Sequence, residues 1–201
     1  MPAFVEFSKA IFRAGPTQAN IQKEEACVLG SLVSRPIVYR RNDVGWIAAC
    51  AWRARAKADD LAALKRAKRA LDPRLIREAA ELLSALVRRL HGDGAAAAVT
   101  SVPCGHSRRP DCFGKQIAQT VADDLGVPFL QVFADRPCSG VSHPKEFAKL
   151  PPLEQITDPL SSMLLVDDLA TSGWHVEESL TALRRLGASA SAFMWIAGTV
   201  A

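Results

Sequence analysis

Two apolar runs of strand length, separated by a helical pattern, are the feature that most constrains the fold of this chain. Residues 162–167 and 190–196 have the length and composition of buried strands, and Val176, Leu180 and Leu183 recur between them at helical spacing. A strand, a helix and a second strand in this order form a β-α-β unit, whose two strands are parallel. We therefore predict an α/β protein with a mostly parallel sheet flanked by helices.

A second unit of the same kind precedes this one. Residues 95–102 and 129–133 are further apolar runs of strand length, and the helix between them is predicted from Ile117, Val121 and Leu125. A long segment rich in proline, residues 134–160, then leads to the last unit. Segments of this length in a compact domain are usually functional or disordered.

Two helices are predicted before these units. The first covers residues 59–71, and Asp72-Pro73 then supplies an N-cap followed by proline at the first helical position. The second helix ends at residues 91–94, and its apolar face is predicted to consist of Ile76, Ala79, Leu83, Leu86, Val87 and Leu90.

The first part of the chain has weaker patterns. Residues 26–30 and 36–39 are short apolar runs that we interpret as strands, and residues 46–52 fit either a strand or a helix. We accordingly divide the chain into an N-terminal hood or accessory segment, residues 1–58, and a core, residues 59–201.

Composition and charge narrow the class of protein. The chain has 201 residues, of which 49% are hydrophobic and 23% charged, so one domain with or without an appendage is expected. The net charge of +4 is compatible with a phosphorylated ligand or with weak affinity for nucleic acid. The basic residues between positions 53 and 69 have no aromatic residues among them, which favours a solvated helix face, with nucleic-acid contact as the alternative.

The cysteines and the hydrophobic pattern indicate where in the cell the protein is expected. Five cysteines are widely spaced without a CxxC pair, which favours reduced thiols in the cytoplasm. The N-terminus carries an early acid, and no stretch of about 18 apolar residues occurs, so we expect neither secretion nor membrane insertion. A transition-metal site at Cys104, His106 and Cys112 is disfavoured because its fourth ligand would have to come from the distant Cys138 or His143.

The acidic pair Asp167-Asp168 ends the strand predicted at residues 162–167 and precedes a small hydroxyl-rich loop. Ligands of open parallel sheets bind beyond the carboxyl ends of the strands. Two carboxylates can accept hydrogen bonds from vicinal hydroxyls or hold a hydrated Mg²⁺, and the start of a helix favours a phosphate. These features predict a sugar-phosphate site, whose phosphate is held by Ala170, Thr171, Ser172 and Gly173. The alternative is that the acids only end the strand, with Thr171 or Ser172 capping the next helix.

This run resembles the phosphoribosyl-pyrophosphate (PRPP) signature of type I phosphoribosyltransferases. The resemblance implies the type I phosphoribosyltransferase fold with a small N-terminal hood. It implies that Asp167 and Asp168 are catalytic, contact the ribose hydroxyls and bind Mg²⁺ directly or through water. It also implies that residues 170–173 hold the 5′-phosphate.

The second half is also similar to the ComF family of competence proteins. A strand ending in Val102-Pro103, a following loop with two arginines and Gln116 at the opening of a helix carry this similarity. The zinc-binding cysteines often found at the N-terminus of that family are missing. The resemblance implies that the first loop contacts pyrophosphate through Cys104, Gly105, His106, Arg108 and Arg109. Lys145 and Lys149 are candidates for a lid over the pyrophosphate, with ordinary surface lysines as the alternative.

The function implied is transfer of phosphoribosyl from PRPP to a nitrogenous acceptor with release of pyrophosphate, as in nucleotide metabolism. The expected partners are a phosphorylated small molecule and a second copy of the chain in a homodimer, with no membrane. The sequence differs from the family pattern at residues 112–116 and at Trp174-His175. These differences favour the alternative of a non-catalytic PRPP or nucleotide sensor that engages nucleic acid or a protein partner.

Overall fold

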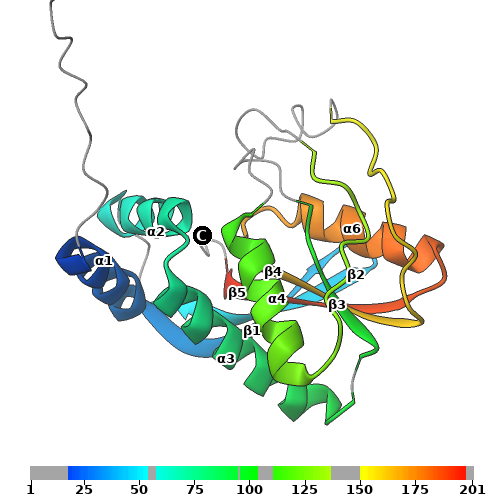
Figure 1. Ribbon diagram of the computed structural model, residues 1–201, viewed down its shortest axis with the longest axis horizontal. Helices are drawn as coiled ribbons and strands as arrows, with labels where there is room; N and C mark the ends of the chain where they lie inside the picture. The colour runs from blue at the N-terminus through cyan, green and yellow to red at the C-terminus, as the bar shows by residue number, and fades with distance from the viewer. Residues whose placement is uncertain (1–17, 54–57, 95, 104–110, 137–149, 198–201) are drawn as a thin grey trace, which may run out of the picture.

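The computed structural model describes residues 18–53, 58–94, 96–103, 111–136 and 150–197 (Figure 1). Its elements in chain order are α1 (Gln18–Ser31), β1 (Leu32–Arg41), β2 (Val44–Trp52), α2 (Ala58–Ala70), α3 (Pro73–His91), β3 (Ala98–Ser101), α4 (Phe113–Leu125), β4 (Ser162–Ala170), α6 (Trp174–Arg185) and β5 (Ser189–Ala197).

One five-stranded sheet with the strand order β1-β2-β5-β4-β3 organises the described chain. β2, β5, β4 and β3 run parallel, whereas β1 is antiparallel to β2. The expected mostly parallel sheet flanked by helices is therefore confirmed. The last predicted unit is β4-α6-β5, whose strands pair from Ser162 with Ser189 to Ala170 with Ala197.

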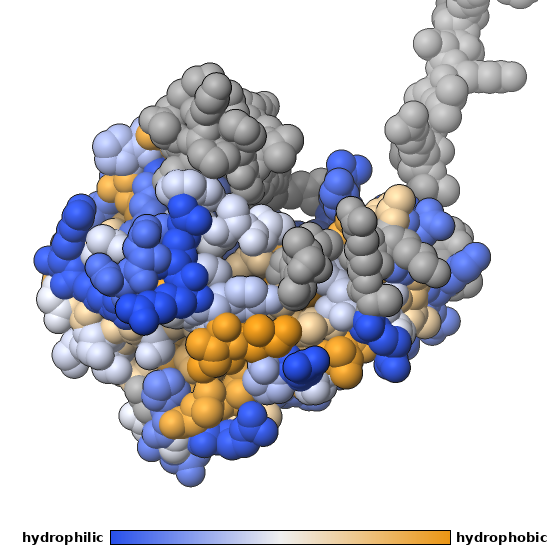
Figure 2. All heavy atoms as spheres, turned by 180° about the vertical axis from the view of Figure 1, so that it is seen from behind, coloured by the Kyte–Doolittle hydropathy of each residue, from blue (hydrophilic) through white to orange (hydrophobic). Residues whose placement is uncertain are grey.

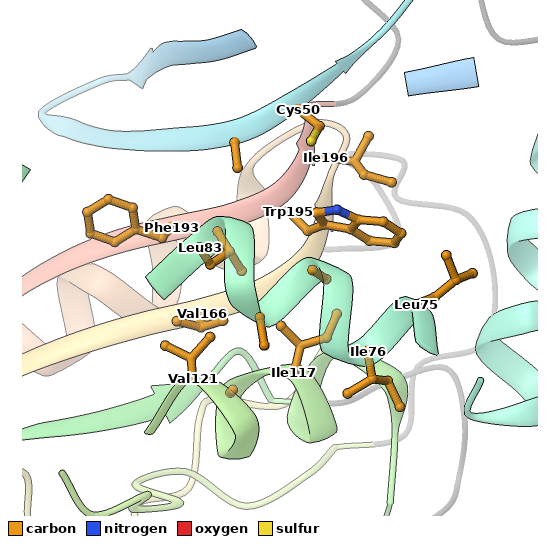
Figure 3. Packing of buried hydrophobic residues seen from close by; sticks show 14 of the residues in the cluster. Cys50, Leu75, Ile76, Leu83, Ile117, Val121, Val166, Phe193, Trp195 and Ile196 are labelled. Carbon is orange, nitrogen blue, oxygen red and sulfur yellow. The ribbon is translucent and has the colours of Figure 1, made fainter. Parts of the chain in front are cut away.

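Helices cover the sheet on both faces because side chains alternate along its strands. Leu164 and Val166 of β4 belong to one hydrophobic cluster with α3 and α4, and Met163 and Leu165 belong to another with α6. Figure 3 shows the first cluster, in which Val166 lies beside side chains of α4. The helices that follow β3 and β4 are thus on opposite faces of the sheet.

The start of α3 forms as its sequence predicts. Asp72 Oδ1 accepts hydrogen bonds from the backbone N–H groups of Arg74 (3.0 Å) and Leu75 (3.4 Å), and Pro73 occupies the first helical position. The predicted apolar face is buried except at Leu90, which is 47% exposed. Leu90 was wrongly placed in the core because the whole last turn, residues 88–91, is exposed.

The four short apolar runs of the chain differ in how far local pattern predicts their structure. Residues 26–30 lie in α1 and not in a strand, because an apolar run this short also fits the buried face of a helix. Residues 36–39 lie in β1, as predicted, and residues 46–52 lie in the strand β2. Residues 129–133 do not form the predicted strand. They make only isolated bridges, from Phe129 to Val99 and from Phe133 to Gln155, because the chain leaves the sheet edge there.

The part of the chain before residue 58 contributes to the same sheet as the part after it, through β1 and β2. The division at residue 58 stays a prediction. α1 and α2 lie side by side at one end of the molecule (Figure 1), joined by a hydrogen bond from Ser31 Oγ to Asp60 Oδ1 (2.8 Å).

The surface is mainly hydrophilic on the face seen in Figure 2, with a small hydrophobic patch among the polar side chains. Exposed large hydrophobic residues of the described chain are Val33, Val38, Leu90, Ile156, Leu160 and Leu186. Among the described residues, no helix combines the length and the apolar composition needed to cross a membrane.

Candidate functional site

The carboxyl ends of β3 and β4 lie where the connections of the sheet diverge. β4 lies on one side of β3 and pairs with its residues 98–101. The chain that follows α4 lies on the other side of β3, at the bridge between Val99 and Phe129. The helices that follow these two strands cover opposite faces. Such a switch point is the usual ligand crevice of an open parallel sheet, so we place the candidate site there.

β4 continues to Ala170, three residues beyond its predicted end, so Asp168 lies within the strand together with Asp167. Asp167 Oδ1 accepts a hydrogen bond from the backbone N–H of Asp168 (2.9 Å), and Asp168 is only 6% exposed. α4 comes very close: a Cβ atom on Gly114 would lie 2.2 Å from Asp167 Oδ1. The acidic pair thus lies near the end of β4, with the start of α4 against Asp167.

Lys68 of α2 is the counter-ion of the acidic pair. Its Nζ lies 2.6 Å from Asp168 Oδ2, and the two side chains are 34% and 8% exposed. Burial alone would lower the pKa of Lys68, but the charge and hydrogen bond of Asp168, with the charge of Asp167, raise that pKa above its usual value. The site therefore contains a fixed positive charge beside its two carboxylates.

The sequence interpretation of this basic helix was wrong for Lys68. Residues 65, 66 and 69 are exposed, as a solvated face requires, whereas Lys68 turns toward the site. A signal was present, because Lys68 follows the buried Leu64 by four residues and such residues share a helix face.

The loop after β4 begins α6 without a side-chain cap. Gly173 is the N-cap residue, with a left-handed φ of 74°. The alternative in which Thr171 or Ser172 caps the helix is therefore wrong. Thr171 is exposed and Ser172 half-buried, while Ala170 closes β4 opposite Ala197. The two hydroxyl residues thus lie between the acidic pair and the first turn of α6.

The hairpin of β1 and β2 packs against this loop. A Cβ atom on Gly173 would lie 2.3 Å from Trp46 Cη2, so the indole ring packs directly against the loop backbone. Trp46 in turn stacks on Tyr39 with their ring centroids 5.7 Å apart. The position of Gly173 is therefore determined by the hairpin.

The same hairpin holds the first turn of α6. The guanidinium carbon of Arg41 lies 3.5 Å from the ring centroid of Trp174, and Arg41 Nε lies 2.6 Å from Glu177 Oε2. Asn42 also donates a hydrogen bond to Glu177. Trp174 thus packs under Arg41 at the edge of the loop, a cation–π contact to the first residue of α6.

Lys115, which follows Gly114 in α4, is buried. Its Nζ lies 2.7 Å from Asp135 Oδ2 and 3.1 Å from Gln131 Oε1. These contacts tie α4 to the segment that follows it.

Arg136 contacts both Pro151 and α6. Arg136, only 7% exposed, donates a hydrogen bond to the carbonyl oxygen of Pro151 (2.5 Å) and forms an ion pair with Glu178 of α6. Arg136 therefore links Pro151 to Glu178 of α6.

Several predicted site residues lie outside the described part of the chain: Cys104, Gly105, His106, Arg108, Arg109, Lys145 and Lys149. The pyrophosphate loop and the lid therefore stay predictions. Cys138 and His143 also lie outside it. Within the described ranges, no group of three or more His, Cys, Asp or Glu side chains could hold a metal ion, and Cys27, Cys50 and Cys112 are not in disulfide bonds.

Comparison with known proteins gives structural likeness only. No protein-family model matches the sequence, and no curated protein is significantly similar to it. Orotate phosphoribosyltransferase from Aeropyrum pernix aligns with a TM-score of 0.42 and 18% identity over 88% of this chain and 80% of that one. Adenine phosphoribosyltransferase from Thermoanaerobacter pseudethanolicus aligns with a TM-score of 0.44 and 15% identity over 85% and 97%. Orotate phosphoribosyltransferase from Mycobacterium tuberculosis aligns with a TM-score of 0.34 and 14% identity over 88% and 95%.

Proposed function

We propose that this protein is a type I phosphoribosyltransferase, closest to the ComF-like proteins, that binds PRPP with Mg²⁺. It transfers the phosphoribosyl group to a nitrogenous acceptor and releases pyrophosphate. The observation that carries the proposal is the position of Asp167-Asp168 near the carboxyl end of β4, beside the switch point and two strand residues before the loop into α6.

Each part of the site has a role in this proposal. Asp167 and Asp168 accept hydrogen bonds from the ribose hydroxyls. Residues 170–173 and the first turn of α6 bind the 5′-phosphate, since a helix N-terminus favours an anion. The loop that contains Arg108 and Arg109 binds the pyrophosphate group, where arginine provides paired donors.

Mg²⁺ fits this site only together with the ligand. Asp168 Oδ2 already faces the Lys68 ammonium, and Asp167 Oδ1 already accepts a hydrogen bond, so the pair offers few oxygens to a bare ion. Mg²⁺ in proteins usually keeps several waters and binds through one or two carboxylates with substrate phosphates. The acidic pair would therefore hold Mg²⁺ through water or ribose hydroxyls, and the ligand would supply phosphate oxygens.

The same geometry accounts for the proposed reaction. Cleavage of the bond between the anomeric carbon and the pyrophosphate oxygen leaves positive charge on the sugar. Asp167 and Asp168 favour that transition state because their negative charges are already in place beside the sugar. Mg²⁺, when bound, neutralises charge on the departing pyrophosphate.

Thermal unfolding with PRPP and Mg²⁺ tests the binding. A ligand at 100 times its dissociation constant stabilises the folded state by about 2.7 kcal/mol, so wild type should melt at a clearly higher temperature. The double variant Asp167→Asn, Asp168→Asn should lose this shift. Asp93→Asn, whose side chain is 97% exposed, should keep it. No shift in wild type, or an equal shift in the double variant, refutes the proposal.

Pyrophosphate release separates the enzyme from the non-catalytic sensor. PRPP and Mg²⁺ are incubated with a panel of purine, pyrimidine and amine acceptors, and the pyrophosphate formed is measured. Release that depends on one acceptor supports the transferase. Binding without release from any acceptor supports the sensor.

A further inference from the structure

Lys68 brings a charge from α2 into a site otherwise built on the sheet. Its ammonium lies against Asp168, and the thiol of Cys112, the N-cap residue of α4, is close enough to help raise the pKa of Lys68. Asp167 in turn lies against Gly114 in the first turn of α4, so the ammonium is near the side of the acidic pair where the chain from β3 enters α4. That side is where the proposed pyrophosphate loop joins α4.

The ammonium has hydrogen-bonding capacity beyond its ion pair. A lysine ammonium carries three N–H donors. Within the described chain, the recorded hydrogen bond of Lys68 goes to Asp168. With 34% of its side chain exposed, Lys68 can offer the remaining donors to a ligand without leaving Asp168.

A cation at this place favours the binding of an anion beside the acidic pair. A phosphorylated ligand that binds beside two carboxylates meets like-charge repulsion, which is strong where water is partly excluded. Lys68 interacts with both Asp167 and Asp168, so it offsets part of the negative charge that an anionic ligand would meet there.

We propose that Lys68 is a ligand-binding residue that contacts the pyrophosphate group of the ligand while it stays paired with Asp168, so that α2 completes the site. This inference rests on the proposed function and adds to it a residue that binds the leaving group. It assigns α2 a direct part in binding, where the sequence indicated a solvated helix.

Isothermal titration calorimetry with pyrophosphate and with ribose 5-phosphate, each with Mg²⁺, tests the inference. Lys68→Met should weaken pyrophosphate binding by roughly tenfold or more, the usual cost of one charge-assisted hydrogen bond, and change ribose 5-phosphate binding less than about twofold. Ser172→Ala should instead weaken ribose 5-phosphate binding more than pyrophosphate binding. Lys68→Arg should retain most of the pyrophosphate affinity because it keeps the charge.

Lys65→Met is the matched control, since it removes an exposed lysine from the same helix and should change neither affinity. Lys68→Met leaves Asp168 without its counter-ion and can impair folding. The same comparison is therefore repeated between Asp168→Asn and the double variant Asp168→Asn, Lys68→Met, in which no unpaired carboxylate remains.

Unchanged or tighter pyrophosphate binding in Lys68→Met overturns the inference, and so does an equal loss for both ligands, which indicates a purely structural role. If wild type binds both ligands and Lys68→Met binds them with equal affinity, this inference alone is refuted. Wild type that binds neither ligand refutes the proposed function and this inference with it.

Discussion

Gly114 shows how one residue allows two elements to meet at the site. Its missing side chain leaves the space that Asp167 Oδ1 occupies, since a Cβ atom there would lie 2.2 Å from that oxygen. Real Cβ atoms do not approach an oxygen so closely. The short side chain of Asp167 is also held by the N–H of Asp168, so it has little freedom to move aside.

The substitution Gly114→Ala should therefore separate stability from binding. Alanine favours the helical state by up to about 1 kcal/mol over glycine, which offsets part of the clash in α4. Asp167 must shift, and affinity for ribose 5-phosphate should fall roughly tenfold or more, because binding depends on exact placement. Calorimetry and thermal unfolding measure the two effects.

Gly30→Ala in α1 provides the control for that substitution. Nothing lies within 4 Å of its Cβ position, so it should gain the helix propensity and leave binding unchanged. Gly114→Ala with wild-type affinity would contradict the close approach of α4 to Asp167.

The residue scale also shows the limit of sequence interpretation. The acidic pair and the hydroxyl loop were predicted from their order along the chain, and the structure places them in the last residues of β4 and before α6. Lys68 was missed because its partner Asp168 is distant in sequence, so no local pattern connects them.

At the scale of elements, the β1–β2 hairpin and α6 form one unit around the loop that follows β4. Trp46 packs against Gly173, and Arg41 contacts Trp174 and Glu177. The hairpin comes from the part of the chain with the weakest sequence pattern. It nevertheless determines where the proposed phosphate loop lies.

Gly173→Ala tests this arrangement. A residue with a Cβ atom costs about 1–2 kcal/mol in the left-handed conformation, and here the Cβ atom would also meet Trp46. The free energy of unfolding, measured in urea, should fall, and ribose 5-phosphate binding should be lost as the loop moves.

Gly187→Ala is matched to it, with a φ of 87° and nothing within 4 Å of the Cβ position. Gly187→Ala should cost only the conformational term and keep ligand binding. Equal effects of the two substitutions on unfolding would show that Trp46 does not constrain the loop.

Element prediction succeeded where a pattern was long or capped. α3 and α4 lie where their periodicity and the Asp72 cap place them. Short apolar runs were harder, because residues 26–30 fit a helix as well as a strand, and residues 129–133 lack strand partners along most of their length.

At the scale of the whole molecule, the buried thiol of Cys50 couples stability to pH. Burial, with a smaller effect of the Glu78 charge, raises the pKa of Cys50 from 9.0 to about 11. Because the folded-state pKa is the higher one, the stabilisation is complete below pH 9 and is lost as pH rises toward about 11.

The free energy of unfolding should therefore fall by about 1–3 kcal/mol between pH 8 and pH 11 on account of this thiol, at about 1.4 kcal/mol per unit of pKa shift. Urea unfolding of wild type and of Cys50→Ala across this range measures the difference in slope. Cys50→Ala should be less stable at pH 8, since it leaves a small cavity, but its stability should decline less steeply. Parallel curves for the two proteins would contradict the assignment.

The sequence by itself determined the order of the last β-α-β unit, the start of α3 and the position of the acidic pair at a strand end. These features depend on periodicity, capping and turn chemistry within a few neighbouring residues. Only the tertiary structure decided that β2 joins β5, that Gly114 admits Asp167, that Trp46 supports Gly173 and that Lys68 neutralises Asp168. Each of these contacts joins segments far apart along the chain, and such contacts form only when the packing of the whole sheet and its helices brings those segments together.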